Sequence, residues 1–134
     1  MKLSPGLIAV AASEIEAATA SARMRGIRVY SFSTGVGGGR DAFFDAVRAT
    51  LPLDPPLISN HSWDALSDSV FGGLYALGAG RVLLIWADAA EMAAADPSEA
   101  SIAMEVLADV AATLAEPQHT QDRPTSVTVL TVIN

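Results

Sequence analysis

The chain has 134 residues, of which 51% are hydrophobic and 17% charged, so it can bury a sizeable core and lacks the composition of a disordered tail. Its 15 acidic and 8 basic side chains give a formal net charge of −7, which disfavours direct binding to nucleic acid and favours a basic protein partner, although a role in solubility alone explains the charge as well. The chain has no Cys, and no apolar run approaches the roughly 20 residues of a membrane span. Its N-terminal sequence resembles a signal peptide only weakly. We therefore expect one cytoplasmic domain over residues 1–134.

The first predicted elements are a helix, a strand and a second helix. Ser4-Pro5 is a typical helix start, and Ala-rich sequence extends the helix to about Arg23. Residues 27–32 alternate apolar and polar side chains, as a strand does. After a glycine-rich loop at 35–39, apolar side chains at helical spacing predict a helix over 41–51.

Helices and strands continue to alternate in the second half of the chain. Prolines at 52, 55 and 56 impose an extended link, and Asn60 and Ser62 are both good caps for a helix over 63–77. The continuous apolar run at 82–86 is typical of a strand buried on both faces. The remaining predicted elements are a short helix over 88–95, a long helix over 97–115 and a β-branched strand over 127–133.

The order of elements predicts an α/β fold. Strands that are separated by helices pair in parallel, and the crossovers between them are right-handed. We therefore expect a three-stranded parallel sheet packed with helices, and an extra N-terminal helical extension over residues 1–25.

The glycine-rich loop lies between a predicted strand and a helix, which is where phosphate-binding loops occur. A dinucleotide fingerprint requires Gly where Arg40 stands, and a P-loop requires Lys and then Ser or Thr where this chain has Arg40-Asp41. A flexible connection is thus favoured over a phosphate cradle, and we expect no cofactor.

The residue types of a hydrolytic triad occur together at His61, Ser62 and Asp64. Neighbours within one helical turn rarely have the geometry of a base and a nucleophile, and the chain has no Gly-x-Ser-x-Gly motif. The other histidine, His119, is far away in the sequence and has no ligand spacing that indicates a metal site. We expect no catalytic residues, no bound metal and no enzymatic activity.

The helix over 63–77 carries two stripes. One is apolar and is expected to face the core; it consists of Trp63, Leu66, Val70 and Leu74. The other lies about 100° away and consists of Asp64, Asp68, Phe71 and Tyr75. Two carboxylates four residues apart repel each other, and this helix has no basic residue to compensate. Mixed acidic and aromatic surface is typical of a binding site, but the helix dipole also favours Asp64, and either ring can instead tuck under a loop.

The long helix shows the same division more weakly. Its core stripe consists of Ala103, Val106, Leu107, Val110 and Leu114. Glu105, Asp109 and Glu116 fall on the opposite side, where a solvated charged face is the favoured interpretation.

The segment Ser62-Trp63-Asp64-Ala65-Leu66-Ser67-Asp68-Ser69-Val70 resembles the signature helix of the barstar family, the intracellular inhibitors of barnase-like ribonucleases. That helix reads Asn-(Trp/Leu)-Asp-Ala-Leu-x-Asp-Cys-Leu, so Ser62 and Ser69 depart from it. The order of strands and helices extends the likeness over roughly residues 5–133. Residues 57–60 stand where the family has an aromatic-Gly loop.

The resemblance implies a three-stranded parallel α/β fold and a mechanism in which carboxylates replace the substrate's phosphates in the nuclease's active site. Asp64 and Asp68 match the two acids of the family's helix, and Asp109 matches the acid on its later helix. The partner-binding residues expected on this basis are Ser59, Asn60, His61, Asp64, Ser67, Asp68, Phe71, Tyr75 and Asp109.

The partner that the resemblance implies is a basic protein, such as a nuclease toxin, because many relatives look like immunity proteins for polymorphic bacterial toxins. The alternative is a regulatory module that retains the fold and binds a protein other than a nuclease. A small enzyme is the least favoured interpretation, since no catalytic arrangement is evident in the sequence.

Overall fold

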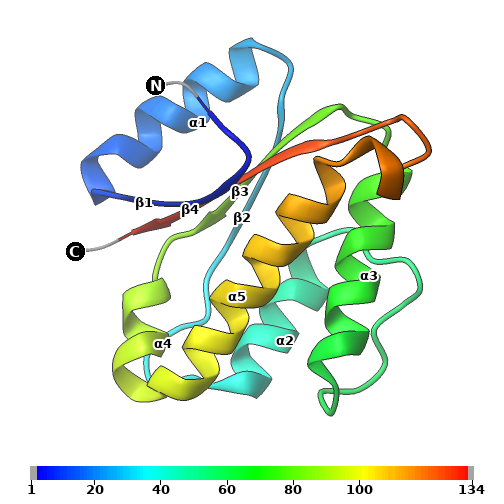
Figure 1. The fold of residues 1–134 in the computed structure, drawn as a ribbon. Coiled ribbons are helices and arrows are strands. Elements are labelled where there is room, and N and C mark those ends of the chain that lie inside the picture. Colours follow the sequence, from blue (N-terminus) through cyan, green and yellow to red (C-terminus); the bar gives the residue numbers. More distant parts are fainter. Residues whose placement is uncertain (1–2, 133–134) are drawn as a thin grey trace.

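The computed structural model describes residues 3–132 and contains one parallel sheet with helices on both of its faces (Figure 1). Four strands lie in the order β1-β4-β3-β2. The strands are β1 (Gly6–Val10), β2 (Arg28–Phe32), β3 (Arg81–Trp86) and β4 (Ser126–Val132). The helices are α1 (Ile15–Met24), α2 (Arg40–Thr50), α3 (Trp63–Ala76), α4 (Ala89–Ala95) and α5 (Pro97–Leu114), with single 3₁₀ turns η1 (Ala12–Glu14) and η2 (Pro117–His119).

The predicted N-terminal helix is wrong in its first half, and the predicted three-stranded sheet has four strands. Residues Gly6–Val10 form β1, and the helix begins only at Ile15. Gly6 has a φ of +115°, which a helix does not allow, and Ile8 and Val10 alternate with Leu7 and Ala9 as in a strand. Gly, Ile and Val are poor helix formers, so the prediction extended the helix of the Ala-rich sequence too far towards the N-terminus, over residues that pair with β4.

The other predicted elements are confirmed to within one residue at each end. The last predicted residue of the final strand, 133, lies outside the described residues. Helix α5 begins as expected at Asp96-Pro97, where the carboxylate of Asp96 accepts a hydrogen bond from the backbone N–H of Glu99 at 3.3 Å.

The order of the strands explains how the helices are distributed. The connection from β1 to β2 crosses the whole sheet in one direction, whereas the next two connections return step by step in the other. Right-handed crossovers in opposite directions use opposite faces of a sheet. Accordingly, α1 covers one face, and α2, α3 and α5 cover the other (Figure 1).

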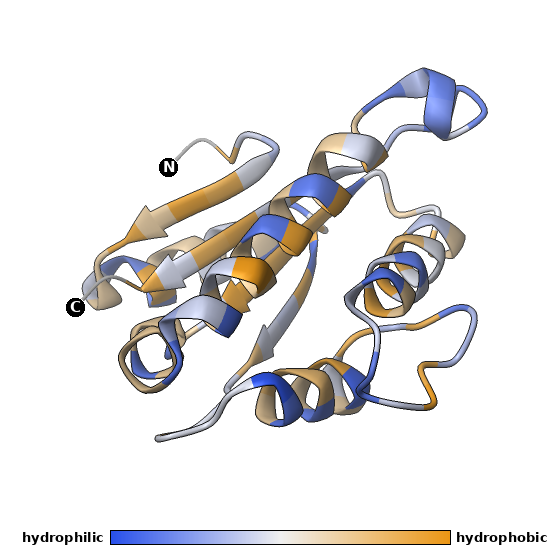
Figure 2. Ribbon diagram, turned by 60° about the horizontal axis from the view of Figure 1, so that its bottom comes forward, coloured by the Kyte–Doolittle hydropathy of each residue, from blue (hydrophilic) through white to orange (hydrophobic). Residues whose placement is uncertain are grey.

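Strand β3 is buried on both faces, as its continuous apolar sequence predicts. Leu83 and Ile85 pack towards α1, while Leu84 and Trp86 pack towards the helices on the other face. Apolar residues follow the strands and the inner sides of the helices in Figure 2, and hydrophilic residues lie on the outer helical surfaces. The sheet and its two apolar layers hold α3 and α5 side by side.

The segment between α2 and α3 runs along α3 at two glycines. A Cβ atom on Gly72 would lie 1.8 Å from the carbonyl oxygen of Asp54, and one on Gly73 would lie 1.9 Å from that of Pro52. The backbone N–H of Asp54 also donates to the carbonyl of Ser69 at 3.0 Å. Only glycine allows this approach, which places the link directly against the helix.

We predict that Gly73→Ala destabilises the protein, because its methyl group would displace the backbone at Pro52. Overpacking of this kind costs about 1–3 kcal/mol of unfolding free energy. Urea denaturation measures the change, with Ala76→Gly on the exposed last turn of the same helix as the control, for which a loss of no more than about 1 kcal/mol is expected. Equal stability of Gly73→Ala and the unaltered protein would contradict the close packing.

Candidate protein-binding site

A groove between α3 and α5 brings together residues from three segments of the chain. It has a volume of about 290 Å³. Its lining consists of Ser67, Asp68 and Phe71 from α3, Asp109, Val110 and Thr113 from α5, and His119 from η2. Four of the predicted binding residues, Ser67, Asp68, Phe71 and Asp109, thus share one groove.

A second hollow, of about 280 Å³, lies on the other side of α3 against the preceding link. Its lining includes Leu57, Ile58 and Ser59 from the link, and Ala65 and Asp68 from α3. Asp68 therefore lies on the ridge between the two hollows. Within residues 3–132, no basic side chain forms an ion pair with Asp64, Asp68 or Asp109, and all three are exposed.

Arg48 of α2 holds the tip of the link. Its Nε donates to the carbonyl of Leu57 at 2.9 Å, its Nη2 donates to Oδ1 of Asn60, and its Nη1 pairs with Asp45 at 3.0 Å. The amide nitrogen of Asn60 donates in turn to Asp41 at 3.0 Å. Predicted residue Asn60 is therefore occupied in fixing the link to α2.

Ile58 lies beside the candidate site and is not among the residues that the sequence analysis predicted. Its side chain is 92% exposed, whereas that of the adjacent Leu57 is buried in the core. In extended backbone, neighbouring side chains point in opposite directions, so two consecutive apolar residues in a proline-rich link were a usable signal. The fixed link holds Ile58 out into solvent beside Asp68.

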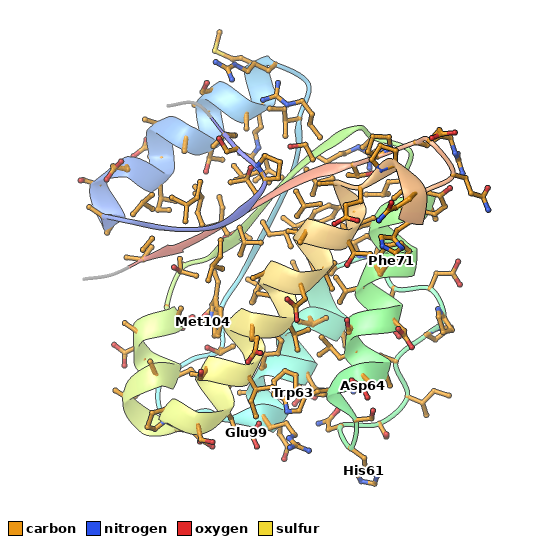
Figure 3. All side chains as sticks on the ribbon, viewed as in Figure 1. His61, Trp63, Asp64, Phe71, Glu99 and Met104 are labelled. Atoms are coloured by element: carbon orange, nitrogen blue, oxygen red, sulfur yellow. The ribbon has the colours of Figure 1, made fainter. Side chains whose placement is uncertain are left out.

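The N-terminal end of α3 is anchored to α2 and α5. The indole Nε1 of Trp63 donates to Glu99 at 3.0 Å, Arg40 pairs with Glu99 at 3.1 Å, and Arg40 also lies over the indole ring (Figure 3). Trp63 packs on Phe43 and Phe44, which confirms its place on the core stripe.

The three residues considered as a hydrolytic triad do not assemble into one. The Oγ of Ser62 accepts from the backbone N–H of Ala65 at 3.1 Å and caps α3, while Asp64 is exposed in the first turn. Figure 3 shows His61 at the end of α3, pointing away from the protein. Within the described chain, no hydrogen bond joins the side chains of these three residues. His61 and Asp64 line neither hollow of α3.

Tyr75 is tucked under the loop that follows α5. Its hydroxyl donates to the carbonyl of Thr120 at 2.9 Å and accepts from Arg123 at 2.8 Å, and the Arg123 guanidinium lies 4.8 Å from the ring centre. Its ring stacks on Phe71 with 5.9 Å between the centroids. Tyr75 lies outside both hollows and supports Phe71, which faces the groove.

The glycine-rich loop is tied at its start by Asp88, which follows β3. The carboxylate accepts from the Ser33 hydroxyl at 2.6 Å and from the backbone N–H groups of Thr34 and Gly35 at 2.9 Å each. Partial burial opposes ionisation, but the hydrogen bonds from Ser33, Thr34 and Gly35 outweigh it and hold the pKa of Asp88 below its ordinary value. An internal carboxylate thus occupies the backbone N–H groups at the start of this loop.

Two further properties bear on the kind of site. In the part of the chain that the structure describes, no three His, Asp or Glu side chains gather closely enough to hold a metal ion. None of the described helices is both long and apolar enough to cross a membrane. What the site offers is acidic and apolar surface on a fixed backbone.

The family described as Barstar (barnase inhibitor) has a model that matches residues 32–130. The matched segment contains α2, the link, α3, β3, α4, α5 and most of β4, and therefore both hollows; β1 and α1 precede it. No curated protein and no solved structure matched the chain.

We predict that Arg48→Met mobilises the link without unfolding the protein. The substitution removes two hydrogen bonds from a charged donor to the link, and the loss of even one costs about 1.5 kcal/mol, so amide exchange at residues 57–60 should become at least about tenfold faster. Hydrogen exchange with mass spectrometry measures this. Arg123→Met is the matched control, and should affect exchange only around residues 120–124. Unchanged exchange at 57–60 in Arg48→Met would show that Arg48 does not fix the link.

The Asp88 carboxylate gives a prediction for pH. Because its folded pKa is lowered, its stabilising effect is complete above the ordinary pKa of an Asp and is lost as the pH falls through the folded pKa. Asp88→Asn should thus lower the unfolding free energy at pH 7, and the difference from the unaltered protein should shrink in acid. Denaturation at several pH values tests this, with exposed Asp122→Asn as the control. A difference that grows in acid would contradict the assignment.

Proposed function

Because the chain belongs to the barstar family, we propose that it inhibits a ribonuclease by covering the enzyme's cationic active site with the groove between α3 and α5. The observation that carries this proposal is the position of Asp68. Its carboxylate is exposed on the ridge between two hollows, and no basic side chain among residues 3–132 forms an ion pair with it.

The electrostatic part of the proposal follows from how a ribonuclease binds its substrate. An active site that holds RNA phosphates presents cationic side chains. The two oxygens of a carboxylate can replace two phosphate oxygens as hydrogen-bond acceptors for an Arg guanidinium. Asp68 and Asp109 line the same groove from opposite helices and so present two such groups to one partner surface. Asp64 adds a third carboxylate one helical turn before Asp68.

The apolar part of the site lies on both sides of Asp68. Phe71 lines the groove towards α5, and Ile58 lines the hollow on the link side. Binding hot spots combine buried apolar anchors with charged groups that become desolvated in the complex. We propose that Phe71 and Ile58 exclude water from around the Asp68 carboxylate in the complex, which strengthens its interaction with a cation.

The backbone of the site supports tight binding because it is already ordered. Arg48 holds the link at two points, and Gly72 and Gly73 let the link lie against α3. Groups that are fixed before binding lose little conformational entropy when the complex forms. The contribution of each contact to affinity is correspondingly larger.

We further propose that the ribonuclease is a bacterial toxin and that this chain is its cytoplasmic immunity protein. Affinity capture from the native host followed by mass spectrometry would identify the partner, and a fluorogenic RNA substrate would report its activity while the chain is titrated in. A captured partner without ribonuclease activity would instead support the alternative of a module that binds another class of protein.

We predict that Asp68→Asn abolishes tight binding while the fold is preserved. Removing a carboxylate from a desolvated cationic pocket leaves buried positive charge unpaired and costs about 2–5 kcal/mol, or roughly 30-fold to several thousand-fold in affinity. The loss should appear mainly as faster dissociation, measured by surface-binding kinetics with the captured ribonuclease. Since Asp68 is exposed and has no ion pair, the unfolding free energy should change by no more than about 0.5 kcal/mol.

The control for this experiment is Glu16→Gln, which removes one carboxylate from α1, on the opposite face of the sheet. It should leave both affinity and stability almost unchanged. Equal affinity of Asp68→Asn and the unaltered protein would refute the proposed site even if the chain inhibits the enzyme.

A further inference from the structure

Strand β1 leaves an open edge on the sheet. It is the outermost strand, and within residues 3–132 it pairs only with β4 (Figure 1). An outer strand presents a row of backbone N–H and C=O groups that another strand can use, and proteins commonly protect such an edge with charged side chains. Residues 3–13 contain no charged side chain. By contrast, β2 at the other edge begins with the exposed Arg28.

An apolar groove of about 370 Å³ lies beside this edge, on the face of the sheet that carries α5. Leu7 and Ala9 of β1 form one side of it, Ala90 of α4 and Met104 of α5 form the other, and Thr131 lies at its base. Leu7 is 36% exposed, and Ala9 is exposed as well. Figure 3 shows Met104 on the flank of α5 that faces α4, on the side away from α3. The edge thus combines free backbone groups with uncovered apolar surface.

We propose that β1 pairs antiparallel with β1 of a second copy of this chain, about a two-fold axis at Ile8. The two sheets then join into one of eight strands. In this register Leu7 lies opposite Ala9 of the second copy, so a large side chain meets a small one on the face with the groove. Ile8 meets Ile8 of the second copy on the other face, which carries α1. The strand is therefore complementary to itself in size.

Charge limits where a second copy can approach and directs a basic partner elsewhere. Each copy has a formal net charge of −7, so two copies repel each other at most relative orientations. The neutral segment 3–13 is where they can approach with little local repulsion. A basic partner would be attracted more strongly to the carboxylates of the groove between α3 and α5. A two-fold pairing also closes on itself and leaves neither copy of β1 open.

The dimer is independent of the proposed inhibition. No residue lines both the groove at β1 and either hollow of α3. Both inhibitor sites of the dimer therefore stay open. Salt should act on the two interactions in opposite directions, because it screens the repulsion between two acidic copies but also screens the attraction between the acidic groove and a cationic enzyme.

Sedimentation velocity over a concentration series tests the proposal with the unaltered chain and two variants. Ala9→Lys places a charge on each copy beside the two-fold axis and should raise the dimer dissociation constant at least about tenfold. Ala20→Lys makes the same substitution at an exposed position of α1 and should leave the constant unchanged. The dimer of the unaltered chain should strengthen as salt is added.

A chain that stays monomeric at every concentration and salt level, or an Ala9→Lys variant that dimerises as well as the unaltered chain, would overturn the proposal. Circular dichroism establishes whether Ala9→Lys is folded. If it is not, amide exchange of the unaltered chain decides, since exchange over residues 6–10 must slow as concentration rises, and exchange independent of concentration also overturns the dimer. Neither result alters inhibition of the captured ribonuclease, which tests the proposed function separately.

Discussion

The close contact between the link at residues 51–62 and α3 is the constraint on which the candidate site depends. Gly72 and Gly73 bring the carbonyl oxygens of Asp54 and Pro52 to where side chains would otherwise begin, so the link can follow the helix. Arg48 then fixes its far end to α2. Without this contact Asp68 would lie on an ordinary exposed helix face, and Ile58 would have no fixed position relative to it. The site is therefore built from backbone packing as much as from carboxylates.

The distribution of hydrogen bonds separates structural carboxylates from those that can bind a partner. Asp88 and Glu99 are surrounded by donors from their own chain, and they hold a loop and the start of α3 in place. Asp68 and Asp109 have no basic partner within residues 3–132, although the protein has arginines that could have been placed beside them. Since an isolated exposed carboxylate adds little to stability, folding does not account for the acidic groove, and the proposed cationic partner would supply the missing counter-charge.

Features that depend on short stretches of sequence, such as which side of a helix or strand is buried, were predicted correctly. The apolar stripe with Leu66 and Val70 is buried, and the apolar run of β3 is buried on both faces. Asp68 and Asp109 line one groove, but a site role for Asp109 was expected only from the resemblance to the barstar family. The missed contacts all join residues far apart in the chain: Arg48 with Leu57 and Asn60, Tyr75 with Thr120 and Arg123, and β1 with β4. Residues 6–10 were misassigned because the Ala-rich sequence that follows them favours a helix, while the strand that pairs with them lies at the other end of the sequence.

Strand β1 also determines which strand forms the exposed edge of the sheet. It precedes the segment that matches the barstar family, and it covers β4, whose residues Val127–Val132 are all buried. If β1 were absent, β4, in which four of seven residues are Val or Leu, would form the edge, and exposed apolar edge strands favour aggregation. With β1 in place, β4 is buried, and the outermost strand is shorter, with 5 residues instead of 7. The open edge has thus moved to a shorter, uncharged strand, which the proposed pairing with one more copy would close without further growth.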